Sequence, residues 1–293
     1  MYASGNGVIQ DYTMAYEWYQ KAANQGDATA QKNLGWMYDN GKGVARDYTK
    51  ACEWYQKAAN QGYASAQCNL GYMYDHGNGV TQDYTKAHEW YQKAANQGHA
   101  TAQNNLGCMY ENGKGVARNY TRAYEWYQKA ADQGSLSAQH KLGIMYEKGY
   151  GVKRNYKMAL QLYQKAADQG YVDSLVNVGL LYANGQGVWK NYRKACEFFQ
   201  QAANKGNAMA QYNLGEMYRN GRGVQQNHAT AAELFQQAAK QGYVLAQYRL
   251  GIMYEFGQGV LQNYNSARTW LKKTADQGNK AASNALRRIG YFG

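Results

Sequence analysis

The chain has 293 residues, of which 45% are apolar and none is proline, and its formal charge is +12 because 32 Lys and Arg oppose 20 Asp and Glu. Its four cysteines and five histidines show no C-x-x-C, H-x-x-x-H or H-E-x-x-H spacing, which excludes the usual zinc sites and disulfide frameworks. The cysteines are therefore expected to be free thiols in a reducing, cytoplasmic compartment. The sequence contains neither an apolar run of membrane-spanning length nor an export signal at its start, so we expect a soluble chain without a transmembrane segment.

A repeat of 36 residues runs through the whole sequence. The tetrapeptide G-x-G-V begins at Gly5, Gly41, Gly77, Gly113, Gly149, Gly185, Gly221 and Gly257, at a constant spacing of 36 residues. A second glycine keeps the same spacing at Gly26, Gly62, Gly98, Gly134, Gly170, Gly206, Gly242 and Gly278. Residues 5–292 therefore form eight consecutive repeats without an insertion, and each repeat has two turn signals.

The first predicted element of a repeat is a helix that follows the G-x-G-V turn, which we call helix B. In residues 47–60, Tyr48, Ala51, Tyr55 and Ala58 recur at steps of three and four, the spacing of one helical face. A short polar side chain stands just before this pattern in each repeat, where it can accept a hydrogen bond from a free amide of the first turn. These predicted N-caps are Asp11, Asp47, Asp83, Asn119, Asn155, Asn191, Asn227 and Asn263.

A second helix, which we call helix A, is predicted between the single glycine and the next G-x-G-V turn. In residues 64–75, Ala66, Leu70 and Met73 have helical spacing, and Gly77 follows as a residue suited to end a helix. Helix A also keeps an interior glycine, although glycine costs about 1 kcal/mol there relative to alanine. This glycine is Gly35, Gly71, Gly107, Gly143, Gly179, Gly215 and Gly251 in successive repeats, and we expect a neighbouring helix to approach closely at each.

Two short helices cannot bury their apolar faces alone, so the repeats are predicted to stack into one all-α, right-handed α-solenoid (superhelix) of about eight helix-turn-helix repeats over residues 1–293, phased from Gly5. One copy of the repeat pattern consists of Ala66, Gln67, Leu70, Gly71, Met73, Tyr74, Gly77, Gly79, Ala87, Trp90, Tyr91, Ala94 and Ala95. This pattern resembles the Sel-like repeat (SLR), a branch of the tetratricopeptide-repeat superfamily. The resemblance covers essentially the whole chain. It implies a non-catalytic protein-interaction scaffold or adaptor without a cofactor. Members of that family occur in bacteria, where they are often exported and linked to host interaction or envelope signalling, and in eukaryotic endoplasmic-reticulum degradation complexes.

The two ends depart from the repeat pattern. Met1 and Tyr2 align with the tail of helix A in the next repeat, so we expect the chain to begin inside a truncated helix A, and an export signal could precede it. At the other end Arg287 replaces the interior glycine and Arg288 adds charge, which gives the polar face typical of a capping repeat. Residues 279–293 are therefore predicted to form a C-terminal capping helix.

The pair Gly41 and Lys42 invites comparison with a nucleotide-binding loop. A P-loop has four residues between its first glycine and the Gly-Lys pair, and Ser or Thr after it, whereas here five residues separate Gly35 from Gly41 and Gly43 follows the lysine. The lysine position also varies between repeats, while the flanking glycines do not. The sequence therefore favours a turn in which glycine ends one helix and directs the next.

Function is expected where the repeats differ, because the shared positions are used in stacking. Three variable columns at steps of four residues fall along one stripe of helix A, the helix that lines the concave surface of tetratricopeptide-like solenoids. This predicted partner-binding groove contains Lys32, Trp36, Tyr72, His76, Asn104, Cys108, His140, Ile144, Leu180, Tyr212, Glu216, Tyr248, Ile252 and Phe256. Its apolar content indicates binding of a peptide or protein; the alternative is that several of these side chains pack against the next helix A.

A second candidate surface is basic. Residues 140–205 hold ten Lys and Arg against four Asp and Glu. The predicted basic edge contains Lys153, Arg154, Lys157, Lys190, Arg193 and Lys194. It could bind nucleic acid or an anionic membrane or polysaccharide, but a solvated rim is the interpretation we favour. A β-lactamase-like hydrolase is the third alternative, by analogy with cysteine-rich relatives, and it is disfavoured because the chain has neither paired cysteines nor an S-x-x-K motif.

Overall fold

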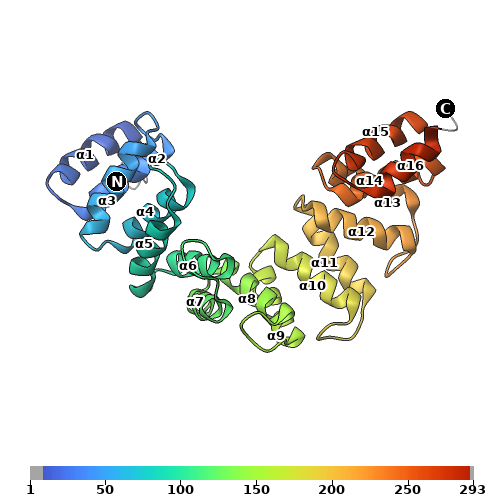
Figure 1. Cartoon of the computed structure of the whole chain (residues 1–293), viewed down its shortest axis with the longest axis horizontal. Coiled ribbons are helices and arrows are strands. Elements are labelled where there is room, and N and C mark those ends of the chain that lie inside the picture. Colours follow the sequence, from blue (N-terminus) through green and yellow to red (C-terminus); the bar gives the residue numbers. More distant parts are fainter. Residues whose placement is uncertain (1–8, 291–293) are drawn as a thin grey trace. The chain divides into compact units, whose positions relative to one another are not determined.

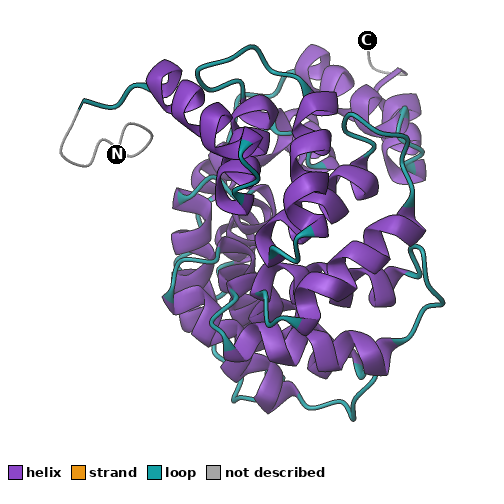
Figure 2. Cartoon of the chain, turned by 90° about the vertical axis from the view of Figure 1, so that its left-hand side faces the viewer, coloured by secondary structure: helices purple, strands orange, loops and turns teal. Residues whose placement is uncertain are grey.

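The computed structural model describes residues 9–290, and this part of the chain contains sixteen α-helices and no strand (Figures 1 and 2). The helices are α1 (Tyr12–Asn24), α2 (Ala28–Asn40), α3 (Tyr48–Asn60), α4 (Ala64–His76), α5 (Tyr84–Asn96), α6 (Ala100–Asn112), α7 (Tyr120–Asp132), α8 (Leu136–Lys148), α9 (Tyr156–Asp168), α10 (Val172–Asn184), α11 (Tyr192–Asn204), α12 (Ala208–Asn220), α13 (His228–Lys240), α14 (Val244–Phe256), α15 (Tyr264–Ala275) and α16 (Lys280–Gly290). Odd numbers are helices B and even numbers are helices A. The prediction of an all-α solenoid of helix-turn-helix repeats is confirmed.

The chain divides into two compact units, residues 1–154 and residues 155–293. Within each unit every helix packs against the next one in the chain, so the repeats follow one another in sequence order (Figure 1). The packed faces are apolar: Leu70, Met73 and Tyr91, for example, are completely buried. Within each unit the repeats thus share their cores with their neighbours, as the repeat pattern predicted.

The predicted helix ends are confirmed. The Asp or Asn before every helix B accepts a hydrogen bond from a backbone N–H two or three residues further on; Asp47 Oδ1, for example, accepts from Lys50 N at 3.0 Å. At the end of α4 Gly77 adopts a φ of 70°, and its N–H donates to the carbonyl oxygen of Met73. Local hydrogen bonds therefore fix both ends of these short helices.

The interior glycine of helix A allows the close approach that the sequence predicted. A Cβ at Gly71 would lie 2.7 Å from the ring of Tyr91 in the following helix B, closer than real Cβ atoms approach their neighbours. The same relation holds at Gly35, Gly107, Gly179, Gly215 and Gly251, where the facing side chains are Tyr55, Tyr127, Phe199, Phe235 and Leu271. The cost of glycine in a helix is offset by burial of a large side chain against the bare backbone.

The second glycine of the G-x-G turn joins adjacent repeats, which the sequence analysis did not foresee. Gly79 has a φ of 70°, and a Cβ there would overlap the carbonyl oxygen of Tyr48, the first residue of helix B in the preceding repeat. Backbone therefore contacts backbone across the repeat boundary. An L-amino acid at this position would meet both an unfavourable φ and a steric clash.

Buried glutamines form a second link between repeats. Gln67 is 5% exposed; its Nε2 donates to the carbonyl oxygen of Ala59 at 3.2 Å, and its Oε1 accepts from Gln97 Nε2 at 2.8 Å. Gln97 Nε2 also donates to the carbonyl oxygen of Gly62. Equivalent pairs are Gln31 with Gln61, Gln103 with Gln133, Gln211 with Gln241 and Gln247 with Gln277. In each pair an exposed glutamine thus supplies a hydrogen-bond donor to the buried amide of the preceding repeat.

The two chain ends were the subject of separate predictions. Of the predicted C-terminal helix, α16 covers Lys280–Gly290 and buries Ala282, Ala285 and Ile289. Arg288 Nη2 donates to Glu255 Oε2 at 2.8 Å, which supplies a counterion to a carboxylate that is 4% exposed. The predicted truncated helix A at Met1 and Tyr2 lies outside the described residues.

Candidate functional site

The predicted groove residues differ widely in exposure. Trp36, Tyr72 and Phe256 are 40%, 44% and 54% exposed, and His76 is exposed beside Tyr72. His140 is buried. The others are partly buried: Lys32, Asn104, Cys108, Ile144, Leu180, Tyr212, Glu216, Tyr248 and Ile252. Exposed aromatic side chains of helix A are therefore present in both units, on α2 and α4 in residues 1–154 and on α14 in residues 155–293.

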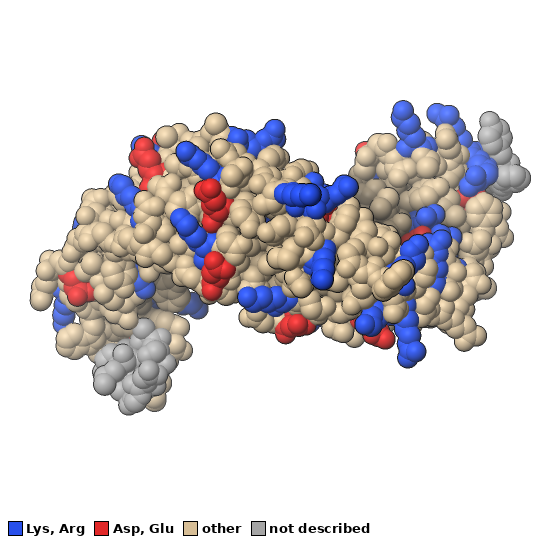
Figure 3. Space-filling view, turned by 90° about the horizontal axis from the view of Figure 1, so that it is seen from below, with Lys and Arg blue, Asp and Glu red and all other residues tan. Residues whose placement is uncertain are grey.

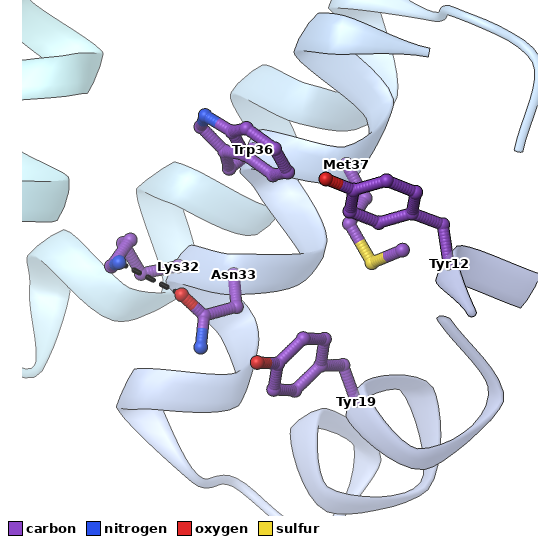
Figure 4. A pocket seen from close by; sticks show the side chains of 6 residues that line it. All are labelled: Tyr12, Tyr19, Lys32, Asn33, Trp36 and Met37. Carbon is purple, nitrogen blue, oxygen red and sulfur yellow. Dashed lines mark hydrogen bonds between the residues drawn. The ribbon is translucent and has the colours of Figure 1, made fainter. Parts of the chain in front are cut away.

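Trp36 and Lys32 border a pocket of about 260 Å³ between α1 and α2 (Figure 4). Lys32 Nζ donates to Asn33 Oδ1 at 2.8 Å, and the hydroxyls of Tyr12 and Tyr19 point from α1 toward α2. The rings of Tyr12 and Trp36 are 6.5 Å apart between centroids. The pocket thus combines aromatic walls with an amide and an ammonium group.

A larger pocket of about 430 Å³ lies between α4 and α6 and contains Tyr72, His76 and Cys108 of the predicted groove. The rings of Tyr72 and His76 stack with centroids 4.0 Å apart and an interplanar angle of 26°. The other lining residues are Asp75, Tyr91, Thr101, Asn105, Met109, Asn112 and Lys114. A planar aromatic wall therefore stands beside a carboxylate and a buried phenol.

One repeat further along the same unit, the acid and the tyrosine at the equivalent positions are bonded to their neighbours. Tyr127 Oη donates to Glu111 Oε2 at 2.6 Å and lies 3.1 Å from Cys108 Sγ, and Lys141 Nζ pairs with the same Glu111 oxygen at 3.0 Å. Burial raises the pKa of Cys108. Here the polar groups satisfy one another, so this level of the helix A surface carries a hydrogen-bonded network.

In the second unit several predicted groove residues take part in packing. Glu216 pairs with Arg219 at 2.9 Å and with Arg249 at 3.0 Å. The ring of Tyr212 lies 5.7 Å from Phe235 and 5.3 Å from Tyr243. Leu180, Tyr248 and Ile252 pack against the buried clusters of this unit. A pocket of about 440 Å³ precedes α13, but its lining, from Tyr218 and Val224 to Asn227, includes none of the predicted residues.

The six residues of the predicted basic edge are exposed, but they belong to different units. Lys153 and Arg154 end the first unit, and Lys157, Lys190, Arg193 and Lys194 belong to the second. Residues 1–154 hold 16 Lys and Arg against 13 Asp and Glu, whereas residues 155–293 hold 16 against seven. Basic side chains stand out singly or in small groups on the face in Figure 3. The excess positive charge therefore belongs mainly to residues 155–293.

The helices and the clusters of metal-binding side chain types limit the kinds of site in residues 9–290. None of these helices combines the length and apolarity that crossing a membrane requires. No group of three or more His, Cys, Asp and Glu side chains in residues 9–290 is arranged to hold a metal ion.

Every repeat matches the model of the Sel1 repeat, over residues 1–27, 28–63, 64–99, 100–135, 136–171, 172–207, 208–243 and 244–279. The chain belongs to the Sel1 repeat family. Proteins of this family are generally non-catalytic, and stacked helix pairs of this kind serve as protein-interaction scaffolds. The predicted family is confirmed.

Solved structures of bacterial proteins are similar to this Sel1 repeat chain. One is c5321, a protective antigen present in uropathogenic Escherichia coli strains, with 39% identity over 94% of this chain and 59% of that one and a TM-score of 0.84. Another is a Sel1 repeat protein from Oxalobacter formigenes, with 36% identity over 94% of this chain and 79% of that one and a TM-score of 0.78. Yeast Tom70 shares the fold at 14% identity, over 96% of this chain and 57% of that one, with a TM-score of 0.51. No curated protein matches the chain.

Several pocket residues were absent from the predicted groove. Asp75, Tyr91 and Asn105 line the pocket between α4 and α6 but lie outside the three variable columns of helix A. The sequence does carry a signal for Asp75: the same position is acidic in the first four helices A, at Asp39, Asp75, Glu111 and Glu147. Tyr91 belongs to a shared core column, so only its place in the structure shows that it reaches a pocket.

Proposed function

We propose that this Sel1 repeat protein is a non-catalytic scaffold that binds an extended peptide or protein segment across the helix A surface of residues 1–154. The observation that carries the proposal is the pair of exposed aromatic side chains, Trp36 and Tyr72, which stand on consecutive helices A with a pocket beside each. Rigid aromatic side chains next to pockets are the usual anchors of protein interfaces. Their spacing by one repeat suits a partner that makes one contact per repeat.

The absence of catalysis is part of the same proposal. It is supported by the family, whose members are generally non-catalytic, and by the state of the thiols. Burial raises the pKa of Cys52 and Cys196 to about 11 and of Cys68 to about 12, so these groups are poor nucleophiles at neutral pH. A hydrolase would be indicated instead by turnover of nitrocefin.

The test uses a random peptide library displayed on phage and selected against the full chain. Selected peptides are synthesised, and their affinities are measured by calorimetry for the wild type and for a Trp36→Ala/Tyr72→Ala variant. We expect binding at least tenfold weaker in the variant with an unchanged far-ultraviolet circular dichroism spectrum, because both side chains are already partly exposed. The control is Trp189→Ala/Leu261→Ala, which removes two side chains that are 93% and 91% exposed and lie directly after G-x-G-V turns. Equal affinities for all three proteins would refute the proposed surface.

A second candidate function is binding of an anionic polymer by residues 155–293, because this unit has 16 Lys and Arg against seven Asp and Glu. Attraction of this type depends steeply on salt. Retention on heparin that disappears between low and moderate salt would support it, and passage through the column at low salt would exclude it.

A further inference from the structure

The pocket between α4 and α6 contains a buried hydroxyl that no side chain satisfies. Tyr91 is completely buried and lines the pocket, and its Oη has no hydrogen-bond partner among the described residues. The equivalent hydroxyls of the neighbouring repeats are bonded: Tyr55 Oη donates to Asp39 at 3.4 Å and Tyr127 Oη to Glu111 at 2.6 Å. Buried polar groups nearly always have a partner, so the Tyr91 hydroxyl is available to a bound group.

The carboxylate in this pocket also lacks the ammonium partner that the two following acids of its column have. Glu111 pairs with Lys141 Nζ at 3.0 Å, and Glu147 pairs with Lys148 Nζ at 2.7 Å. Asp75 has a side chain that is 19% exposed, and its nearest basic atom among the described residues is an imidazole nitrogen 4.0 Å away. Among these three acids, Asp75 is the one without an ammonium or guanidinium partner.

Two positions near Asp75 carry neutral amides. The position of Lys141 is occupied one repeat earlier by Asn105, which lines the pocket near the Tyr91 hydroxyl but makes no hydrogen bond of normal length to it. Arg46, whose charge acts on Asp39 in the preceding repeat, corresponds to Gln82 here. Gln82 Nε2 donates to the carbonyl oxygen of Asp75 at 2.7 Å. Neither position supplies a cation to Asp75.

The basic groups already in the pocket are engaged elsewhere. His76 Nδ1 lies 3.1 Å from the carbonyl oxygen of Tyr72, while its ring stacks on the Tyr72 ring. Lys114 Nζ lies over the ring of Tyr84, 4.9 Å from its centroid, and no ion pair joins it to Asp75. The pocket therefore offers acceptors and a flat aromatic wall to a positively charged group from outside.

We propose that this pocket binds an arginine side chain of the peptide partner, with the guanidinium against Asp75 and the Tyr91 hydroxyl and the methylene chain along the Tyr72 and His76 rings. The bound arginine takes the place that Lys141 fills beside Glu111 one repeat later. A guanidinium suits the site better than an ammonium because its planar fork can bond a carboxylate with two N–H groups, donate to a further acceptor and stack on an aromatic ring. This inference rests on the proposed peptide-binding function and names one residue type that the surface selects.

The direct test compares two synthetic peptides, acetyl-Ala-Ala-Arg-Ala-Ala-amide and the same peptide with citrulline, which has the shape of arginine without its charge. Binding to the full chain is followed by nuclear magnetic resonance titration at pH 8. We expect the arginine peptide to bind at least tenfold more tightly and to shift the amide signals of Tyr72 and Asn105. Equal binding of the two peptides, or binding of neither, would overturn the inference.

Conservative variants locate the effect. Asp75→Asn is expected to weaken the arginine peptide about tenfold and leave the citrulline peptide unchanged, and Tyr91→Phe to weaken the arginine peptide about threefold. Because the Tyr91 hydroxyl is unbonded, Tyr91→Phe should unfold at the same or a higher temperature than the wild type, so weaker binding would not reflect misfolding. Matched controls one repeat earlier, Asp39→Asn and Tyr55→Phe, should keep wild-type affinity; equal losses in the controls would refute the site.

Selection of the random peptide library against the wild type and Asp75→Asn separates this inference from the function on which it rests. Enrichment of arginine in the peptides selected by the wild type, and its loss with Asp75→Asn, would support both. Peptides that depend on Trp36 but show no preference for arginine would overturn the inference and leave the proposed function standing. A library that yields no binding peptide would count against both.

Discussion

Alanine variants of two turn glycines are expected to separate the conformational cost of a side chain at positive φ from the steric cost of a contact between repeats. Gly79 and Gly98 both have positive φ, 70° and 86°. A Cβ at Gly98 would have no atom within 4 Å, whereas a Cβ at Gly79 would overlap the carbonyl oxygen of Tyr48. Gly98→Ala therefore tests the conformation alone, and Gly79→Ala tests the conformation together with the contact between repeats.

The magnitudes follow from these two terms. An L-residue in the left-handed region costs roughly 1–2 kcal/mol, and the stiffer unfolded chain returns about 0.4–1 kcal/mol, so Gly98→Ala should destabilise by about 1 kcal/mol. Forcing atoms into a filled space adds typically 1–3 kcal/mol, so Gly79→Ala should cost about 3 kcal/mol. We expect the difference to be about 2 kcal/mol.

Urea unfolding followed by circular dichroism measures both variants, together with native-state hydrogen exchange, because repeat arrays need not unfold in one step. The exchange protection of α3, which begins at Tyr48, and of α4, which ends just before the turn with Gly79, should fall more in Gly79→Ala than in Gly98→Ala. Free energies of unfolding that agree within about 0.5 kcal/mol would show that the backbone contact between repeats does not contribute, and would refute the reasoning.

Three further predictions concern titrating groups. Burial lowers the pKa of His88, so the unfolded chain binds the proton more readily and stability is lost as the pH falls below about 6.5. His88→Tyr, which places the residue of the following repeat at this position, should reduce the fall in melting temperature between pH 7.5 and pH 5. An unchanged fall would contradict this prediction. Burial raises the pKa of Cys52 and Cys68, so at pH 8 their thiols should react with Ellman's reagent at least a hundredfold more slowly in the native protein than in urea, and rapid native reaction would contradict it. Burial also raises the pKa of Asp39, so the folded chain binds this proton more readily, and the contribution of Asp39 to stability falls as the pH rises from about 3.8 through the folded pKa. Asp39→Asn should therefore be at least as stable as the wild type at pH 7. A large loss of stability in this variant at pH 7 would refute the direction of the effect.

The sequence determined the architecture of this protein because each structural decision is local and is repeated at a constant spacing. Asp47 before helix B and Gly77 after helix A act within a few residues of their own position, and both ends were predicted correctly. The glycine at Gly71 was predicted to allow close approach, although the partner, Tyr91, became known only from the structure. Eight matching copies made these assignments secure, since a chance pattern would not persist over 36-residue steps.

Tertiary structure alone decided which groups of the helix A surface are free. Variability between repeats selected Trp36 and Tyr72, which are exposed, but equally selected Glu216, which is paired with two arginines. The pocket with Asp75 is assembled from three helices and a turn, and one of its lining residues is an asparagine that stands where the next repeat has a lysine. Sequence spacing fixes the face on which a residue lies. Whether its polar atoms are satisfied depends on side chains one repeat away, which meet only when the repeats stack.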